Sequence, residues 1–259
     1  MSVMLLFWLC CCRDVLSWSM PPMAAPMMAT TSTPMTPLFG LGAVLMKATG
    51  GVSTAPSFGD EDVLVEAADF FTDAFWTAKV GGGARTLTDT QRRSLLNSQS
   101  LEFRKRYGKR LGAQRRNELM VARNGRGEIM GVLGIEVDRI PEDRLTSTKI
   151  CATAPLMSNV AVGRKFRRRG VAEELVIAAE NMVRREWGYT ECFLYVEKRN
   201  APAVKLYRKL GYRKIWEDDN AKTLIPTKLG GMTNDQTTLV CMRKDLSQGL
   251  FKRVLLPFR

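Results

Sequence analysis

Regular patterns of hydrophobic and polar positions begin at about residue 60 of the 259-residue chain. "DVLVEAA", from Asp62 to Ala68, alternates enough to predict a first strand. "AADFFTDAFWTAK" then places Phe70, Phe71 and Phe75 at helical spacing, which predicts a helix with one apolar face. A second helix is predicted over "DTQRRSLLNSQSLEFRKRYGKRL", which Thr88 and Asp89 can cap.

The second half of the chain predicts a hairpin followed by alternating helices and strands. The hairpin joins Leu119–Arg123 to Ile129–Val137 across an Asn-Gly turn signal. A strand that ends at Val162 and a helix from about Gly170 to Trp187 come next. Further patterns predict a strand "CFLYVE", a helix "APAVKLYRKL", and strands "YRKIWED" and "TTLVCMRKDL". The predicted order, β-α-α-β-β-β-α-β-α-β-β, indicates an α/β (α+β) domain.

Residues 1–59 have a different composition and are predicted to be a disordered leader to a domain spanning 60–259. They contain no acidic residue after Asp14 and only one arginine, and they are rich in Ser, Thr, Ala and Pro. Such leaders are typical of plastid transit peptides. "VMLLFWLCCC" has the length of a signal-peptide core but is too short to span a bilayer. Either the leader is bipartite or the true start is a later methionine, and no transmembrane segment is expected in the mature chain.

Charge and composition narrow the chemistry. The formal net charge of +13 suggests an acidic partner: nucleic acid, a membrane surface or a phosphate-rich cofactor. The chain has no histidine, which excludes a catalytic triad that needs an imidazole base. The six cysteines lack the spacing of a zinc site, so no metal is expected.

The segment "NVAVGRKFRRRGVAEELV" concentrates five basic residues between a predicted strand and a predicted helix. Gly170 and Ala172 are small, so the backbone there can approach a ligand closely. The free N–H groups of a helix start, with arginines beside them, make a seat for a pyrophosphate. Taken alone, an exposed basic turn explains the segment equally well.

A second motif, "NAPAVKLYRKLGY", follows about thirty residues later. It places Ala203 and Tyr207 on one face of a short helix that Asn200 can cap and Gly211 can end. Together, Arg-x-x-Gly-x-Ala and Asn-x-x-Ala-x-x-x-Tyr-x-x-x-Gly-Tyr resemble the GNAT superfamily of acetyl-CoA-dependent N-acetyltransferases. The element order resembles this superfamily over about residues 63–245, and the motifs themselves cover about 157–216.

The resemblance implies a fold, a co-substrate and site residues. The fold is a central, mixed, mostly antiparallel sheet of six to seven strands with about four helices, in which strands 4 and 5 splay to admit acetyl-CoA. Asn200 is expected at the pantetheine arm and Tyr207 as the general acid, with a pKa near the ordinary value of about 10. The N–H of Val162 is a candidate donor to the developing oxyanion. The expected acetyl-CoA contacts are completed by Val160, Ala161, Val162, Arg167, Arg168, Arg169, Gly170, Val171, Ala172 and Glu173.

The general base stays open in the sequence. Relatives that acetylate protein N-termini carry a Glu five positions before the motif asparagine, where this chain has Tyr195. Glu136 and Glu197 are candidates, and a water relay is an equal alternative. Glu197 could instead pair with a neighbouring basic residue at the surface.

The resemblance is closest to plastid-type GNAT proteins of plants and algae, which implies protein N-terminal α-amines and lysine side chains as acceptors. The polar stretch from Asp218 to Gln236 is expected to be a loop that shapes the acceptor site, where Asp218 and Asp219 could attract a cationic amine. One alternative is an enzyme that acts on a small amine, such as a polyamine or an arylalkylamine. Another is a non-catalytic basic protein that binds RNA or membranes, although the aromatic strand platform of RNA-recognition domains is absent.

Overall fold

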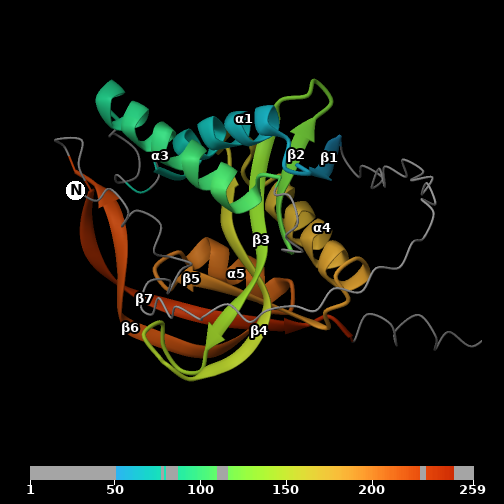
Figure 1. The fold of residues 1–259 in the computed structure, drawn as a ribbon, viewed down its shortest axis with the longest axis vertical. Coiled ribbons are helices and arrows are strands. Elements are labelled where there is room, and N and C mark those ends of the chain that lie inside the picture. The colour runs from blue at the N-terminus through green and yellow to red at the C-terminus, as the bar shows by residue number, and fades with distance from the viewer. Residues whose placement is uncertain (1–50, 77–78, 80–86, 110–115, 228–231, 248–259) are drawn as a thin grey trace, which may run out of the picture.

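The computed structural model of the protein describes residues 51–76, 79, 87–109, 116–227 and 232–247. Nearly all of the predicted leader lies outside these residues. The described part contains seven strands and four α-helices in the predicted order (Figure 1). The strands are β1 (Val52–Pro56), β2 (Asn117–Asn124), β3 (Ile129–Pro141), β4 (Ile150–Val162), β5 (Glu191–Glu197), β6 (Arg213–Pro226) and β7 (Met232–Asp245). The helices are α1 (Glu61–Phe71), α3 (Asp89–Tyr107), α4 (Val171–Arg185) and α5 (Ala201–Lys209).

The strands form one sheet in the order β1-β2-β3-β4-β5-β7-β6. Every neighbouring pair is antiparallel except β4 and β5, which run parallel. This confirms the expected mixed, mostly antiparallel sheet. The predicted hairpin is also confirmed, because β2 and β3 pair across the turn that follows Asn124.

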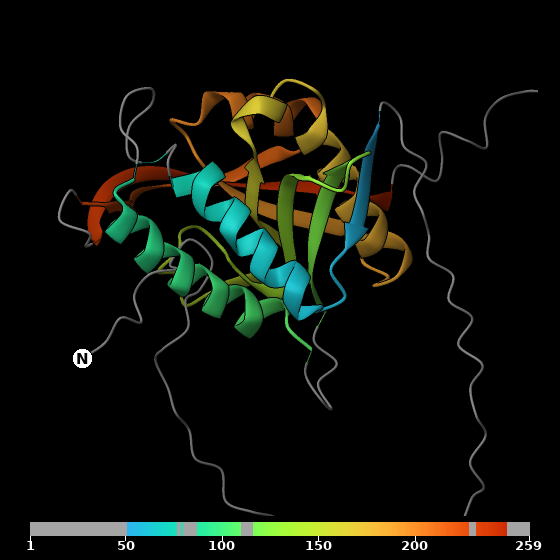
Figure 2. The same cartoon turned by 90° about the horizontal axis from the view of Figure 1, so that it is seen from above.

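Alternating side chains on the strands send two apolar layers to opposite faces of the sheet. Leu119 and Val121 of β2 pack with α1 and α3, while Met120 and Ala122 pack with α4. Figure 2 shows α1 and α3 side by side on one face of the sheet. The helices therefore pack on both faces of the central strands, and this packing fixes the position of β4.

The predicted first strand is wrong, because Asp62–Ala68 belongs to α1. Asp60 caps this helix by accepting hydrogen bonds from the N–H groups of Asp62 and Val63. The helix buries Leu64, Ala67, Ala68 and Phe71, whose spacing of three and four residues is helical.

The first strand is instead β1, which lies inside the segment assigned to the leader. It pairs with β2 at the edge of the sheet, where a strand can carry a proline such as Pro56. The folded part of the chain therefore begins before Asp60.

Apart from residues 228–231, which lie outside the described residues, the stretch from Asp218 to Gln236 is almost entirely strand rather than loop, because β6 continues to Pro226 and β7 begins at Met232. The two strands form a long curved hairpin (Figure 1). The alternation of buried and exposed side chains explains why this polar stretch forms strands: Ala221 and Thr223 are buried, and Lys222 between them is exposed. Within the described residues, no helix has the length and apolarity needed to cross a membrane.

Candidate active site

The parallel strands β4 and β5 separate soon after they meet. They pair only at Leu156 with Phe193 and at Met157 with Leu194. The confirmed splay opens a cavity of about 1720 Å³, whose walls come from β4, β5, α5, the start of α4 and the β6–β7 hairpin. The cavity is therefore lined by residues far apart in the sequence.

A bulge in β4 directs backbone groups into this gap. The register with β3 shifts between Val132 and Gly134, and Asn159 takes a left-handed backbone conformation with φ of 53°. The Asn159 side chain donates a hydrogen bond of 3.0 Å to the Tyr107 hydroxyl, which holds the bulge from the α3 side. The bulge therefore depends on α3 as well as on β4 itself.

Past the bulge, Val162 presents its backbone to the cavity. The N–H of Gly163 donates to the Met130 carbonyl at 3.0 Å, and Val162 lies opposite Gly131. In an antiparallel ladder this makes the Val162–Gly131 pair the non-hydrogen-bonded kind. The N–H and the carbonyl of Val162 therefore point away from β3, toward the side where β5 has diverged.

The basic turn leads into α4 through Gly170, which has φ of 81° and caps the helix without a side chain. The first helical hydrogen bond runs from the Glu174 N–H to the Gly170 carbonyl. The three N–H groups before it, from Val171 to Glu173, have no hydrogen-bond acceptor among the described residues. A Cβ added to Gly170 would meet no atom within 4 Å. The turn thus offers free donors beside open space.

Most of the residues predicted to contact acetyl-CoA line this one cavity. Arg169 is the exception, since it is exposed but does not contribute to the lining. Asn200 caps α5 by accepting a 3.3 Å hydrogen bond from the Ala203 N–H, so its capping role is confirmed. The predicted residues on the cavity wall are Val160, Ala161, Val162, Arg167, Arg168, Gly170, Val171, Ala172, Glu173, Asn200 and Tyr207.

Tyr207 is buried in α5 and lines the cavity. Its ring packs edge-on against Tyr212, with 5.9 Å between the ring centroids. Burial raises the pKa of Tyr207 above its usual value, because the surrounding apolar groups disfavour the charged phenolate. The expectation of an ordinary pKa is therefore wrong, and this phenol holds its proton more firmly.

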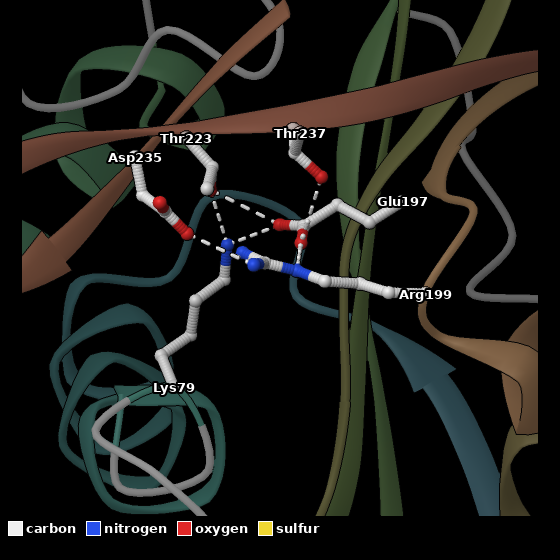
Figure 3. Close-up of polar contacts among 6 residues, drawn as sticks. All are labelled: Lys79, Glu197, Arg199, Thr223, Asp235 and Thr237. Carbon is white, nitrogen blue, oxygen red and sulfur yellow. Dashed lines mark hydrogen bonds and ion pairs between the residues drawn. The ribbon is translucent and has the colours of Figure 1, made fainter. Parts of the chain in front are cut away.

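Glu197, at the end of β5, stands at the centre of a charged cluster (Figure 3). It forms ion pairs with Lys79 and, at 2.7 Å, with Arg199. Thr223 donates to the same carboxylate at 3.0 Å. Burial acts to raise the pKa of Glu197, but hydrogen bonds and charges from Lys79 and Arg199 outweigh it, so the pKa lies below its ordinary value. The pairing with a neighbouring basic residue, Arg199, is therefore confirmed, but the Glu197 carboxylate is largely buried rather than at the surface.

Glu136, the other candidate base, lies outside the cavity lining. It forms an ion pair with Arg106, which is buried and reaches the cavity from α3. Its carboxylate is therefore committed to a neighbouring guanidinium group.

Several residues that line the cavity were not predicted as site residues from the sequence. Trp76, in the π-helical segment Thr72–Trp76 that continues α1, reaches the wall, and so does Lys79. Tyr195, which holds the position of the missing Glu, lines the cavity and packs at a tilted angle against Trp216, with 5.5 Å between ring centroids. Only Tyr195 could have been found from the sequence, by its distance from Asn200.

Comparison with known proteins agrees with this geometry. Residues 86–212 match the family model described as the acetyltransferase (GNAT) family. "GCN5-related N-acetyltransferase 4, chloroplastic" of Arabidopsis thaliana is 33% identical over 92 residues, which cover 35% of this chain and 31% of that protein. An N-alpha-acetyltransferase of Saccharolobus solfataricus is 33% identical over 57 residues, 22% of this chain and 34% of that protein. The matches thus span about a third of the length of these curated relatives.

Two solved structures share the fold. A spermidine N-acetyltransferase chimera of Vibrio cholerae SpeG and hSSAT superposes with a TM-score of 0.50 at 11% identity, over 78% of this chain and 99% of that chain. A ribosomal-protein-S5-alanine acetyltransferase from Vibrio fischeri gives a TM-score of 0.50 at 12% identity, over 78% of this chain and 96% of that chain. At these identities the likeness concerns the fold alone.

The environment of Glu197 predicts how its replacement changes the stability of the protein at different pH values. Because its folded-state pKa lies below the ordinary 4.5, ionised Glu197 stabilises the fold above that pH and ceases to do so as the pH falls through the folded-state value. We expect Glu197→Gln to lower the free energy of unfolding by about 1–3 kcal/mol at pH 7, in the range of hydrogen bonds to charged groups. The difference from wild type should narrow below about pH 4.5, as measured by urea unfolding at several pH values.

The matched control is Glu217→Gln, which removes a half-buried carboxylate paired with the exposed side chains of Lys198 and Lys214. It should change stability less, because exposed ion pairs contribute little. A Glu197→Gln effect that stays constant from pH 7 to pH 3 would contradict the assignment of a stabilising charge.

Proposed function

Because the chain contains an acetyltransferase domain of the GNAT family, we propose that it transfers acetyl groups from acetyl-CoA to protein amines. The acceptors are N-terminal α-amino groups and lysine ε-amino groups. The observation that carries the proposal is the open gap between β4 and β5, with free N–H donors at one end and a cluster of paired charges around Glu197 at the other. The similarity to N-alpha-acetyltransferases supports protein amines as the acceptor class.

The residues at the basic turn fit the diphosphate of acetyl-CoA. Free N–H groups at the start of α4, the partial positive charge of the helix end and the side chains of Arg167 and Arg168 all favour an anion there. Gly170 leaves the space for close approach. When bound, acetyl-CoA supplies the acetyl thioester, and its amide-containing arm would lie along the β4 edge at Val160–Val162, where the Val162 backbone points away from β3.

Two groups of the chain can stabilise or neutralise the charges that develop during acetyl transfer. The N–H of Val162 points into the gap, where it can donate to a carbonyl oxygen that gains negative charge. Tyr207 lines the same gap with its proton in place, so it can protonate the departing sulfur. The raised pKa of Tyr207 keeps the phenol protonated over the physiological pH range.

Neither candidate carboxylate is free to act as the base in this structure. Glu197 is held by two cations and has a lowered pKa, and Glu136 is paired with Arg106. We therefore propose that the attacking amine loses its proton to water in the cavity rather than to either carboxylate.

Replacement of the general acid is the first test. We expect Tyr207→Phe to lower kcat by roughly 100-fold or more, the range for a positioned acid, with little change in the KM for acetyl-CoA. The matched control is Tyr212→Phe, since Tyr212 is an equally buried neighbour that does not line the cavity. Mass spectrometry of a peptide library incubated with acetyl-CoA reports the products, as new acetyl groups on N-termini or lysines. An undiminished rate in Tyr207→Phe would remove Tyr207 from the mechanism.

The open space at Gly170 gives a test of acetyl-CoA binding. Gly170→Ala should raise the Kd for acetyl-CoA by about tenfold, because the added methyl group lies where the diphosphate must approach. Gly188→Ala is a matched control: Gly188 has φ of 74°, also has no atom within 4 Å of an added Cβ, and lies beyond the far end of α4. Both variants share the cost of a left-handed alanine, about 1–2 kcal/mol, so only a difference between them reports on the ligand. Equal Kd values of the two variants for acetyl-CoA, measured by calorimetry, would argue against diphosphate binding at Gly170.

We further propose that the protein acts in the plastid. The support is the acid-poor, Ser/Thr/Pro-rich composition of residues 1–59 and the similarity to a chloroplastic relative. Residues 1–59 fused to a fluorescent protein should direct it to plastids of plant or algal cells, as seen by microscopy. The same fusion without residues 1–50 serves as the control, and a signal that stays in the cytosol with the full segment would contradict the proposal.

A further inference from the structure

The ammonium group of Lys79 is bound inside the cavity although no step proposed above uses it. Its side chain is 13% exposed, and its partner Glu197 lies 118 residues away in sequence. The ammonium donates to a Glu197 oxygen and to the Thr223 hydroxyl, and it lies 5.4 Å from the centre of the Phe75 ring. Figure 3 shows Lys79 reaching toward Glu197 and Thr223 from a separate part of the chain.

These partners form a complete binding site for a primary ammonium. An –NH₃⁺ group has three donors and no acceptor. Here it finds a carboxylate, a hydroxyl oxygen and an aromatic face, each of which attracts a cation or accepts a hydrogen bond. Thr223 is only 1% exposed, so its hydroxyl is a fixed part of the site.

The rest of the cluster does not need Lys79 to stay in place. One oxygen of Glu197 accepts from Arg199 at 2.7 Å, and Arg199 also pairs with Asp235 at 2.9 Å. The other oxygen accepts from Lys79 and, at 3.0 Å, from Thr223. With Lys79 absent, two carboxylates would face one guanidinium group. The net negative charge that results would attract another cation to the vacated oxygen.

This site opens on the same cavity as the acetyl-transfer groups. Lys79, Glu197, Val162 and Tyr207 all line it. We propose that Glu197 and Thr223 form the subsite for the ammonium group of the acceptor, and that Lys79 occupies it as an internal substrate mimic. The inference rests on the proposed function, because it names the group by which that function recognises its acceptor.

An internal mimic competes with every external amine. A tethered group acts at an effective concentration in the millimolar range, so a weakly bound acceptor must displace it. The apparent affinity for the acceptor is reduced by the fraction of molecules in which the site is free. Removal of the Lys79 charge should therefore strengthen amine binding rather than weaken it.

The test measures binding without turnover. n-Butylammonium, which reproduces the end of a lysine side chain, is titrated into the full-length protein and followed by NMR, with n-butanol as the uncharged control ligand. We expect Lys79→Met, which keeps the length of the side chain, to lower the Kd for n-butylammonium by roughly three- to tenfold. Binding of n-butanol should not change.

The matched control is Lys222→Met. Lys222 also lines the cavity, but the described residues give it no ion pair. The Lys222→Met substitution removes the same charge without opening the Glu197 site, so the Kd for n-butylammonium should change less than twofold. In the Lys79→Met background, Glu197→Gln should raise the Kd at least tenfold, and Thr223→Val gives a second test that leaves the charges intact. Thermal unfolding of each variant shows whether it is folded.

The outcomes separate this inference from the proposed function. If Lys79→Met lowers the Kd but no variant acetylates peptides, the ammonium subsite stands and the proposed function fails. If peptides are acetylated but Lys79→Met and Lys222→Met behave alike, the subsite is overturned and the function stands. Weaker n-butylammonium binding in a folded Lys79→Met protein would likewise show that Lys79 is a structural ion pair and not a mimic.

Discussion

The site depends on one constraint of backbone pairing: β4 and β5 share hydrogen bonds over only two residue pairs. Strands that diverge leave N–H and carbonyl groups without partners, and such groups must meet either water or a ligand. The bulge at Asn159, held by Tyr107, shifts the register of β4 against β3 so that the Val162 N–H points toward the opening. A well-packed core on both faces of the sheet keeps β4 in this position. The cavity is therefore a product of sheet geometry, to which side chains add chemistry.

Charged groups lie at two ends of that cavity. Arg167, Arg168 and the free amides before Glu174 form a cationic end, where an anion is bound by fixed donors. Glu197 and Asp235 bring negative charge to the other end, balanced by Arg199 and Lys79. A molecule that is anionic at one end and reacts with an amine at the other suits such an arrangement. The chain's formal charge of +13 accords with the cationic end and would not have indicated the carboxylates at the other end.

Local signals explain which parts of this arrangement the sequence could predict. The turn at Gly170, the cap at Asn200 and the hairpin after Asn124 each depend on a few adjacent residues, and all three form as expected. The elements and contacts that the sequence did not predict depend on tertiary interactions. β1 is a short edge strand whose pairing with β2 has no local signature, and the polar β6–β7 hairpin buries small residues on one side only. Lys79 meets Thr223 across 144 residues, a contact that no spacing rule can supply.

Burial of Tyr207 also bears on how the reaction responds to pH. The apolar surroundings that raise its pKa keep the phenol protonated over the physiological pH range. Glu197 is ionised over the same range, since its pKa is lowered. Neither residue changes its charge near neutral pH, and the chain has no histidine to do so. In the proposed acetyl transfer, the group that titrates near neutrality is then the acceptor amine, which must lose a proton before it can attack. An α-amine, with an ordinary pKa of about 8, would then react at lower pH than a lysine amine with a pKa of about 10.4.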